Sequence, residues 1–189
     1  TRPLSAVTLA IPFAPQGIYL LLRGDRPTRV RLLAFGALAA AVAALLFAWQ
    51  FAATGDPFLN PYTLWWDYDR VGFGPGRGLI EGGHTLRQAW INTKFSLKVG
   101  AADLFGWGLP SWIFLPFGLA AVLWRRSGRG LQLAGVALSF VVVYLAYWIG
   151  SWLYGPRYYY EALFSLTILT AAGVAFLAGW PLQPGEPWM

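Results

Sequence analysis

Long stretches without a charged residue alternate with short charged segments along the chain. The uncharged stretches are residues 3–22, 32–53, 104–124, 130–156 and 162–185. Each is long enough for the roughly 20 residues with which a helix crosses the hydrocarbon core of a bilayer. We therefore predict an all-α integral membrane protein with about five transmembrane helices. These helices are expected at about residues 4–22, 32–53, 108–124, 131–150 and 157–180.

The composition agrees with this class. Hydrophobic residues make up 57% of the 189-residue chain and charged residues only 12%, whereas about a quarter of a soluble domain is charged. A soluble all-α protein with very apolar helices is the alternative. The chain has no cysteine, which excludes disulfides and thiolate metal sites. It opens on "TRPLSAV" without an initiator methionine, so we expect an upstream part of the same polypeptide.

Two short arginine-rich segments, residues 23–31 and 125–130, indicate the orientation. The positive-inside rule assigns such short basic loops to the cytoplasm. The rule then places the long loop 54–107 and the short loop 151–160 together on the other side of the membrane. Membrane orientation also accounts for the net charge of +6, so we expect the lipid bilayer as partner and no nucleic acid.

The predicted outer loop 54–107 combines glycine and proline with many aromatic side chains. Disordered linkers lack aromatics, so we expect this loop to be ordered and packed on the membrane face. Its "WDYDR" motif pairs Asp67 with Asp69, a spacing that offers oxygen ligands to Mg²⁺, Mn²⁺ or Ca²⁺. The alternative is a solvated turn in which Asp69 pairs with Arg70.

Two further features of this loop are candidates for chemistry. Arg77 lies in "GFGPGRG", whose flexible peptides either form an anion-binding nest or simply permit a turn. His84 is the only histidine, which leaves it a role as acid, base or hydrogen-bond donor but offers no metal-ligand set.

A helix is predicted within the outer loop at about residues 85–104. Thr85 followed by Gln88 matches a capping box. Arg87, Lys94 and Lys98 fall on one face of this helix, and an apolar stripe that contains a tryptophan lies mainly on another. This pattern is typical of an amphipathic helix in the membrane interface. Its basic face contacts lipid headgroups in general or a phosphate-bearing lipid in particular.

The segment "SWLYGPRYYYEALFSL", residues 151–166, separates two apolar stretches. Pro156 suits the first position of a helix, which places Arg157 in the first turn, where the helix dipole disfavours a cation. Two compensators remain open: an ion pair with Glu161, or an external anion bound by the guanidinium and the helix N–H groups. Neighbouring phenols, among them Tyr154 and Tyr158, add hydrogen-bond donors.

Four segments, "TGDPFLNPYTLWWDYDRVGFGPG", "GHTLRQAWINT", "LFGW" and "LYGPRYYYEAL", resemble the C-terminal half of bacterial fold type C membrane glycosyltransferases. These are relatives of the dolichyl-phosphate-mannose protein mannosyltransferases of family 39. The resemblance implies a multi-pass enzyme of the bacterial inner membrane that takes a sugar from a polyprenyl-phosphate carrier on the non-cytoplasmic side. It implies carrier-phosphate binding by Arg157, Tyr158, Glu161, Arg77, Lys94 and Lys98. It implies stacking on sugar or lipid by Trp65, Trp66, Tyr68 and Tyr154.

The chain departs from this pattern in one respect. The catalytic base of such enzymes is an acidic residue of the first outer loop, and no segment of this sequence corresponds to it. We therefore expect a portion of a glycosyltransferase that is not catalytic alone, with Mg²⁺ or Mn²⁺ as a candidate cofactor. The alternative is a non-catalytic polyprenyl-phosphate-binding or scaffold protein. A transporter is disfavoured because the predicted helices carry few ionisable residues.

Overall fold

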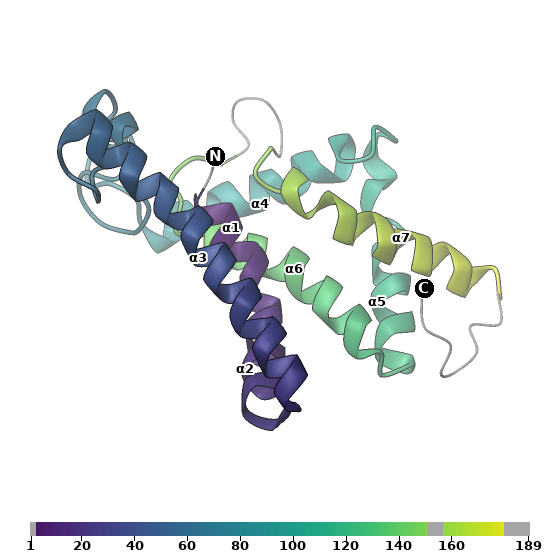
Figure 1. Cartoon of the computed structure of the whole chain (residues 1–189). Coiled ribbons are helices and arrows are strands. Elements are labelled where there is room, and N and C mark those ends of the chain that lie inside the picture. Colours follow the sequence, from purple (N-terminus) through teal and green to yellow (C-terminus); the bar gives the residue numbers. More distant parts are fainter. Residues whose placement is uncertain (1–2, 151–156, 180–189) are drawn as a thin grey trace. The chain divides into compact units, whose positions relative to one another are not determined.

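The structure is a computed structural model that describes residues 3–150 and 157–179. Within these ranges the regular elements are all helices, and Gly74 and His84 form an isolated β-bridge. Figure 1 shows the order of the helices. The α-helices are α1 (Pro3–Ala10), α2 (Ala14–Arg23), α3 (Arg26–Thr54), α4 (Leu86–Asp103), α5 (Leu115–Trp124), α6 (Gly128–Tyr144) and α7 (Leu163–Leu177).

The chain divides into two compact units, and we describe each by itself. The first unit comprises the chain up to Pro12 and from Leu86 onward, and therefore contains α1 and α4 to α7. The second unit, Phe13–Thr85, contains α2, α3 and the first part of the predicted outer loop.

Three helical stretches of the described chain are long and apolar enough to cross a membrane. They are Pro3–Arg23, Arg26–Thr54 and Tyr160–Leu177. The apolar helices Pro110–Trp124 and Gly128–Tyr144 are shorter, with 10–17 residues each. The all-helical membrane class is therefore supported, whereas the predicted number of five spans is not confirmed. Pro110 has non-helical backbone angles, and the chain after Tyr144 tightens into short turns, which shortens both helices.

The first of these stretches is interrupted where the sequence carries prolines. A short 3₁₀ segment, Ile11–Phe13, separates α1 from α2, and Pro15 lies in the first turn of α2. Proline lacks an N–H donor and clashes with the preceding turn, which favours such a break.

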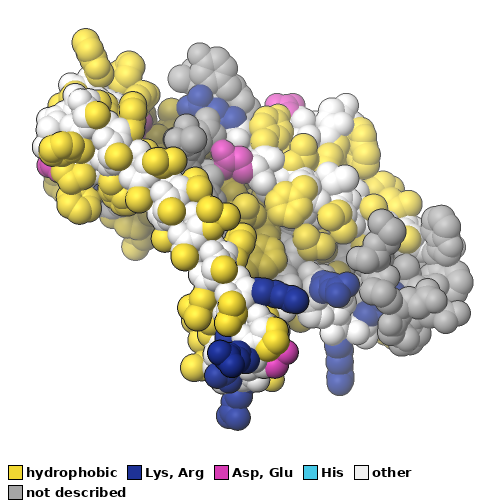
Figure 2. Space-filling view, viewed as in Figure 1, with side chains coloured by type: hydrophobic (Ala, Val, Ile, Leu, Met, Phe, Trp, Pro, Cys, Tyr) yellow, Lys and Arg dark blue, Asp and Glu magenta, His cyan; other side chains and the backbone are white. Residues whose placement is uncertain are grey.

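Helix α3 begins and ends at well-defined caps. The Asp25 carboxylate accepts a hydrogen bond from the Thr28 backbone N–H at 3.2 Å, and Gly55 closes the helix in the left-handed conformation. Hydrogen bonds from Thr28 also hold the pKa of Asp25 below its usual range. Figure 2 shows hydrophobic side chains along α3 and a group of basic side chains at the α2–α3 turn. An apolar helix exposed along its length is typical of a lipid-facing span.

Helices α5, α6 and α7 form the body of the first unit (Figure 1). Helix α5 packs closely on α7 because glycine at positions 118 and 173 has no side chain. A Cβ atom on Gly118 would overlap the carbonyl oxygen of Leu169, and one on Gly173 would overlap the carbonyl of Phe114. The Ser165 hydroxyl donates to the Leu133 carbonyl at 2.5 Å, which joins α7 to α6.

The core of this unit lies between the C-terminal half of α6 and the residues just before α7. It consists of Val136, Phe140, Tyr144, Tyr158, Tyr159 and Ala162. Helix α1 adds to it through two polar contacts: Ser5 with Tyr144, and the Ser139 hydroxyl with the Thr8 carbonyl at 2.9 Å. These contacts hold α1 and α6, which are distant in sequence, together beside residues 157–159.

Candidate functional site

Arg157 lies in a turn, residues 157–159, and not in the first turn of an α-helix. A 3₁₀ segment, Tyr160–Ala162, follows the turn, and α7 begins only at Leu163. The two tyrosines after Arg157 are both buried but point to different elements, and these contacts hold the segment in a turn. The predicted unfavourable interaction of Arg157 with the dipole of an α-helix therefore does not apply, because Arg157 is not in the first turn of α7.

The Arg157 guanidinium is held against its neighbour Tyr158. Its Nη2 atom donates to the Tyr158 hydroxyl at 2.7 Å, and its central carbon lies 4.8 Å from the centre of the Tyr158 ring. A cation over an aromatic face is attracted by the ring quadrupole. Arg157 is half-buried, which keeps part of this strong cation within reach of solvent and of a ligand.

Tyr158 belongs to a cluster of buried or half-buried aromatic rings. Its ring centre lies 5.1 Å from that of Tyr144 and 5.3 Å from that of Tyr147, in tilted and edge-on arrangements. The phenol of Tyr144 is in turn hydrogen-bonded to Ser5. Arg157 thus lies against Tyr158, whose ring packs on Tyr144 at the end of α6 and on Tyr147. The sequence analysis named Tyr158 for this site but not Tyr144, Tyr147 or Ser5.

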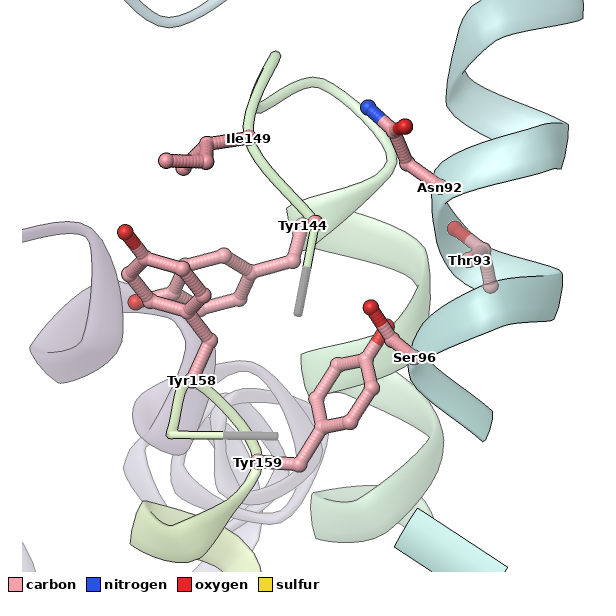
Figure 3. A pocket seen from close by; sticks show the side chains of 8 residues that line it. Asn92, Thr93, Ser96, Tyr144, Ile149, Tyr158 and Tyr159 are labelled. Atoms are coloured by element: carbon pink, nitrogen blue, oxygen red, sulfur yellow. The ribbon is translucent and has the colours of Figure 1, made fainter. Parts of the chain in front are cut away.

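Tyr159 turns the opposite way, towards α4 (Figure 3). It is only 6% exposed, and its hydroxyl is hydrogen-bonded to Thr93 and Ser96. Burial raises the pKa of this phenol above its ordinary value, and the two hydrogen bonds oppose the shift in part. A polar cavity of about 10 Å³ lies beside these groups, which is about the room of a single water molecule.

Helix α4 extends over nearly the predicted residues but buries a face that the sequence analysis did not single out. Its buried side chains include Asn92, Thr93 and Ser96. The Asn92 amide donates to the Trp148 carbonyl at 2.5 Å and accepts from Gln88 at 3.0 Å. The spacing of Asn92, Thr93 and Ser96 along one helical face could have predicted this buried face, since small polar side chains often join helices in membranes.

The outer face of α4 is both basic and apolar. Arg87, Lys94 and Lys98 are exposed there, together with large hydrophobic side chains such as Trp90 and Leu86. A helix that exposes both kinds of side chain, while it buries a small polar face against the protein, suits the membrane interface.

An apolar groove of about 750 Å³ lies in the same unit, between α5, α6 and α7. Its volume falls within the range of about 300–1,000 Å³ that is usual for ligand sites. Leu97 of α4 and Trp112 complete the wall, and the Trp112 indole donates to the Leu97 carbonyl at 3.0 Å. The remaining lining residues, apart from Gly135 and Tyr159, are aliphatic or Phe140.

The predicted site residues between positions 65 and 84 lie in the second unit. Trp65 is 82% exposed, Trp66 is less exposed and packs on Tyr62, and Tyr68 is half-buried. Asp67 is exposed and Asp69 is half-buried. Among the described residues, no group of three or more His, Cys, Asp or Glu side chains is placed to hold a metal ion. The structure therefore does not extend the Asp67–Asp69 pair into a full ligand set.

Arg77 and His84 both help to hold the glycine-rich loop of the second unit. The Arg77 Nε atom donates to the Val71 carbonyl at 3.2 Å, so this guanidinium binds the backbone of its own loop. His84 is 1% exposed and its ring stacks on Phe73, with centres 5.1 Å apart. Gly74 donates to the His84 carbonyl at 2.8 Å. In this structure both residues therefore contact other parts of their own loop.

Of the predicted phosphate ligands, the structure brings Arg157 and Tyr158 into direct contact. Glu161 is exposed in the 3₁₀ segment that follows, and Lys94 and Lys98 are exposed on α4. Tyr154 lies outside the described residues. A scan against protein-family models, a search of curated proteins and a search of solved structures each found no match for this chain.

Proposed function

We propose that this chain is the C-terminal portion of a bacterial inner-membrane glycosyltransferase that uses a polyprenyl-phosphate-linked sugar. In this proposal α5 and α6 add two spans to the three long ones, and the segments 23–31 and 125–130 face the cytoplasm. The observation that carries the proposal is the half-buried Arg157 guanidinium, fixed on Tyr158 just before a membrane-spanning helix. Arginine is well suited to bind a phosphate because its planar fork donates two parallel hydrogen bonds.

The chemistry assigned to this chain is stabilisation of the leaving group. A base from the upstream part of the polypeptide deprotonates the acceptor hydroxyl, whose oxygen attacks the anomeric carbon of the sugar. The bond between that carbon and the phosphate oxygen breaks, and polyprenyl phosphate leaves with the electron pair. In this proposal Arg157 stabilises the negative charge that develops on the phosphate. Trp65, Trp66 and Tyr68 are candidates for stacking on the sugar or the lipid.

A second candidate function is a polyprenyl-phosphate-binding or scaffold protein without transfer chemistry. One observation favours it: no acidic residue is among the described side chains that line either the polar cavity or the apolar groove. A base is required for transfer but not for binding. Both candidates share the phosphate site at Arg157, so the presence of an upstream carboxylate distinguishes them.

Binding of polyprenyl phosphate to the natural full-length protein tests the shared site. We expect Arg157→Ala to weaken binding by about 10- to 100-fold, since a charge-assisted hydrogen bond contributes about 1.5–3 kcal/mol. Arg157→Lys should recover part of this loss, because it keeps the charge without the planar fork. The control is Arg129→Ala at an exposed position at the start of α6. Equal affinities for wild type and Arg157→Ala contradict the proposal.

A further inference from the structure

The segment that follows α3 carries no charge and exposes its largest side chains. This aromatic segment is residues 57–66, "PFLNPYTLWW". Phe58 is 81% exposed and Trp65 is 82% exposed. The other exposed large side chains of the segment are Tyr62, Leu64 and Trp66. Figure 2 shows hydrophobic side chains gathered over the end of α3 and the chain that follows it. Exposed apolar surface of this extent marks a site of interaction with a protein or a membrane.

The aromatic segment turns back along α3. The ring centres of Phe58 and Phe47 lie 5.7 Å apart in an edge-on arrangement. The 3₁₀ segment Pro61–Leu64 also contacts the helix. Phe47 lies about 10 Å before the end of α3 at Thr54, since each helical residue adds about 1.5 Å. The Phe58 ring is therefore held beside the body of α3 and not beyond its end.

The charge pattern of α3 indicates the depth of this contact in a membrane. Arg31 is the last charged residue of the helix, and residues 32–53 are uncharged. These residues extend over about 33 Å, which matches the hydrocarbon thickness of about 30 Å. The end of α3 then lies at the edge of the hydrocarbon, and Phe47 lies inside it. Because Phe47 is itself 43% exposed, the apolar surface of the aromatic segment continues the lipid-facing surface of α3.

The backbone of the aromatic segment is suited to the edge of the hydrocarbon. An unpaired N–H group is costly there because no water accepts its hydrogen bond. The two prolines of the segment have no N–H group. Other backbone N–H groups donate to oxygens of the segment or of Asp56, and they belong to Phe58, Leu59, Tyr62, Thr63, Trp65 and Trp66. Two acceptors are side-chain oxygens: the Asp56 carboxylate for Phe58 at 2.8 Å and the Asn60 amide for Tyr62. Internal pairing of this kind lowers the cost of contact with lipid.

We propose that the aromatic segment anchors the second unit in the lipid bilayer. Its backbone lies at the boundary between headgroups and hydrocarbon, and the side chains of Phe58 and Trp65 enter the acyl chains of that leaflet. Tryptophan and tyrosine are enriched at this level because their rings are apolar and their tips are polar. The anchor uses neither the Arg157 site nor transfer chemistry. It assigns Trp65 to bilayer lipid rather than to a sugar.

Spin labelling of the full-length protein in phosphatidylcholine vesicles tests the anchor. This chain has no cysteine, so in a background without upstream cysteines a nitroxide on Phe58→Cys reports one position. Oxygen concentrates in hydrocarbon and a polar nickel chelate stays in water, so the ratio of their collision rates with the nitroxide reports depth. We expect a ratio severalfold higher than at Glu81→Cys and close to that at Val42→Cys. Glu81 is an exposed charged residue of the same unit, and Val42 is 60% exposed on α3.

Two results would overturn the anchor. A ratio at Phe58→Cys equal to that at Glu81→Cys means that the segment lies in water. Low collision rates with both reagents mean that protein, and not lipid, covers the segment. Should Phe58→Cys fail to fold, Trp65→Cys leaves the contact between Phe47 and Phe58 intact and is read in the same way. The vesicles contain no polyprenyl phosphate, so neither result depends on the phosphate site of the proposed function.

Discussion

The hydroxyl oxygen of Ser5 lies 2.6 Å from the phenol oxygen of Tyr144, which joins α1 to α6 across 139 positions of sequence. Both residues are buried. We expect Ser5→Ala and Tyr144→Phe to be coupled in a double-mutant cycle, by about 0.6 kcal/mol and at most about 1.7 kcal/mol. The double variant should therefore lose less stability than the sum of the single variants. The measurement is the free energy of unfolding in detergent, and strictly additive effects contradict the contact.

The close approach of α5 and α7 depends on glycine at position 118. We expect Gly118→Ala to destabilise the protein by about 1–3 kcal/mol, because the new methyl group overlaps the Leu169 carbonyl and forces the helices apart. Gly36→Ala in α3 is the matched control, since a Cβ atom there meets nothing within 4 Å. This control should be neutral or slightly stabilising, as alanine favours helix more than glycine does. Thermal unfolding of both variants in the same detergent checks the difference.

Tyr159 predicts a loss of stability at alkaline pH. Its pKa in the folded protein is raised above 10.0, so the folded state keeps its proton at pH values where the unfolded state has lost it. The stabilisation is therefore complete below pH 10 and is lost as the pH rises through the folded pKa. We expect Tyr159→Phe to reduce this dependence in unfolding measurements from pH 8 upwards. Tyr160→Phe, at an exposed neighbour, should leave it unchanged.

The glycine-rich loop of the second unit depends on Gly83 for a steric reason. A Cβ atom at Gly83 would overlap the Gly74 carbonyl, next to the bridge between Gly74 and His84. We expect Gly83→Ala to open the bridge and increase proteolytic cleavage within residues 71–84. Gly82→Ala is a sharp control, because Gly82 has a similar positive φ (84° against 75°) but open space around its Cβ position. Equal cleavage in both variants would assign the effect to backbone strain alone.

The sequence predicted the elements whose formation depends on local properties. The uncharged run that became α3 and the amphipathic helix α4 both follow from patterns within a few turns of chain. The site was predicted in part. Arg157 and Tyr158 were predicted as ligands of a carrier phosphate, and the structure shows them in contact with each other.

Hydropathy alone did not predict where α5 begins or where α6 ends. An uncharged run indicates only that its residues can lie in lipid, and it does not indicate where the helix begins or ends. Pro110 has non-helical backbone angles and α5 begins only after it, the chain turns after Tyr144 at the end of α6, and α7 begins only after the turn that contains Tyr158 and Tyr159. These endpoints are set by packing between distant segments.

The sequence by itself therefore determined the helical class, the apolar spans and the amphipathic pattern of α4, because each is a periodic property of neighbouring residues. Tertiary structure alone decided which face of α4 is buried, how closely α5 approaches α7, and that Tyr159 lines both a small cavity beside α4 and an apolar groove. These features require side chains from several helices to meet in space. No pattern within one helix specifies its partners, since their contacts depend on the shape and position of the other surfaces.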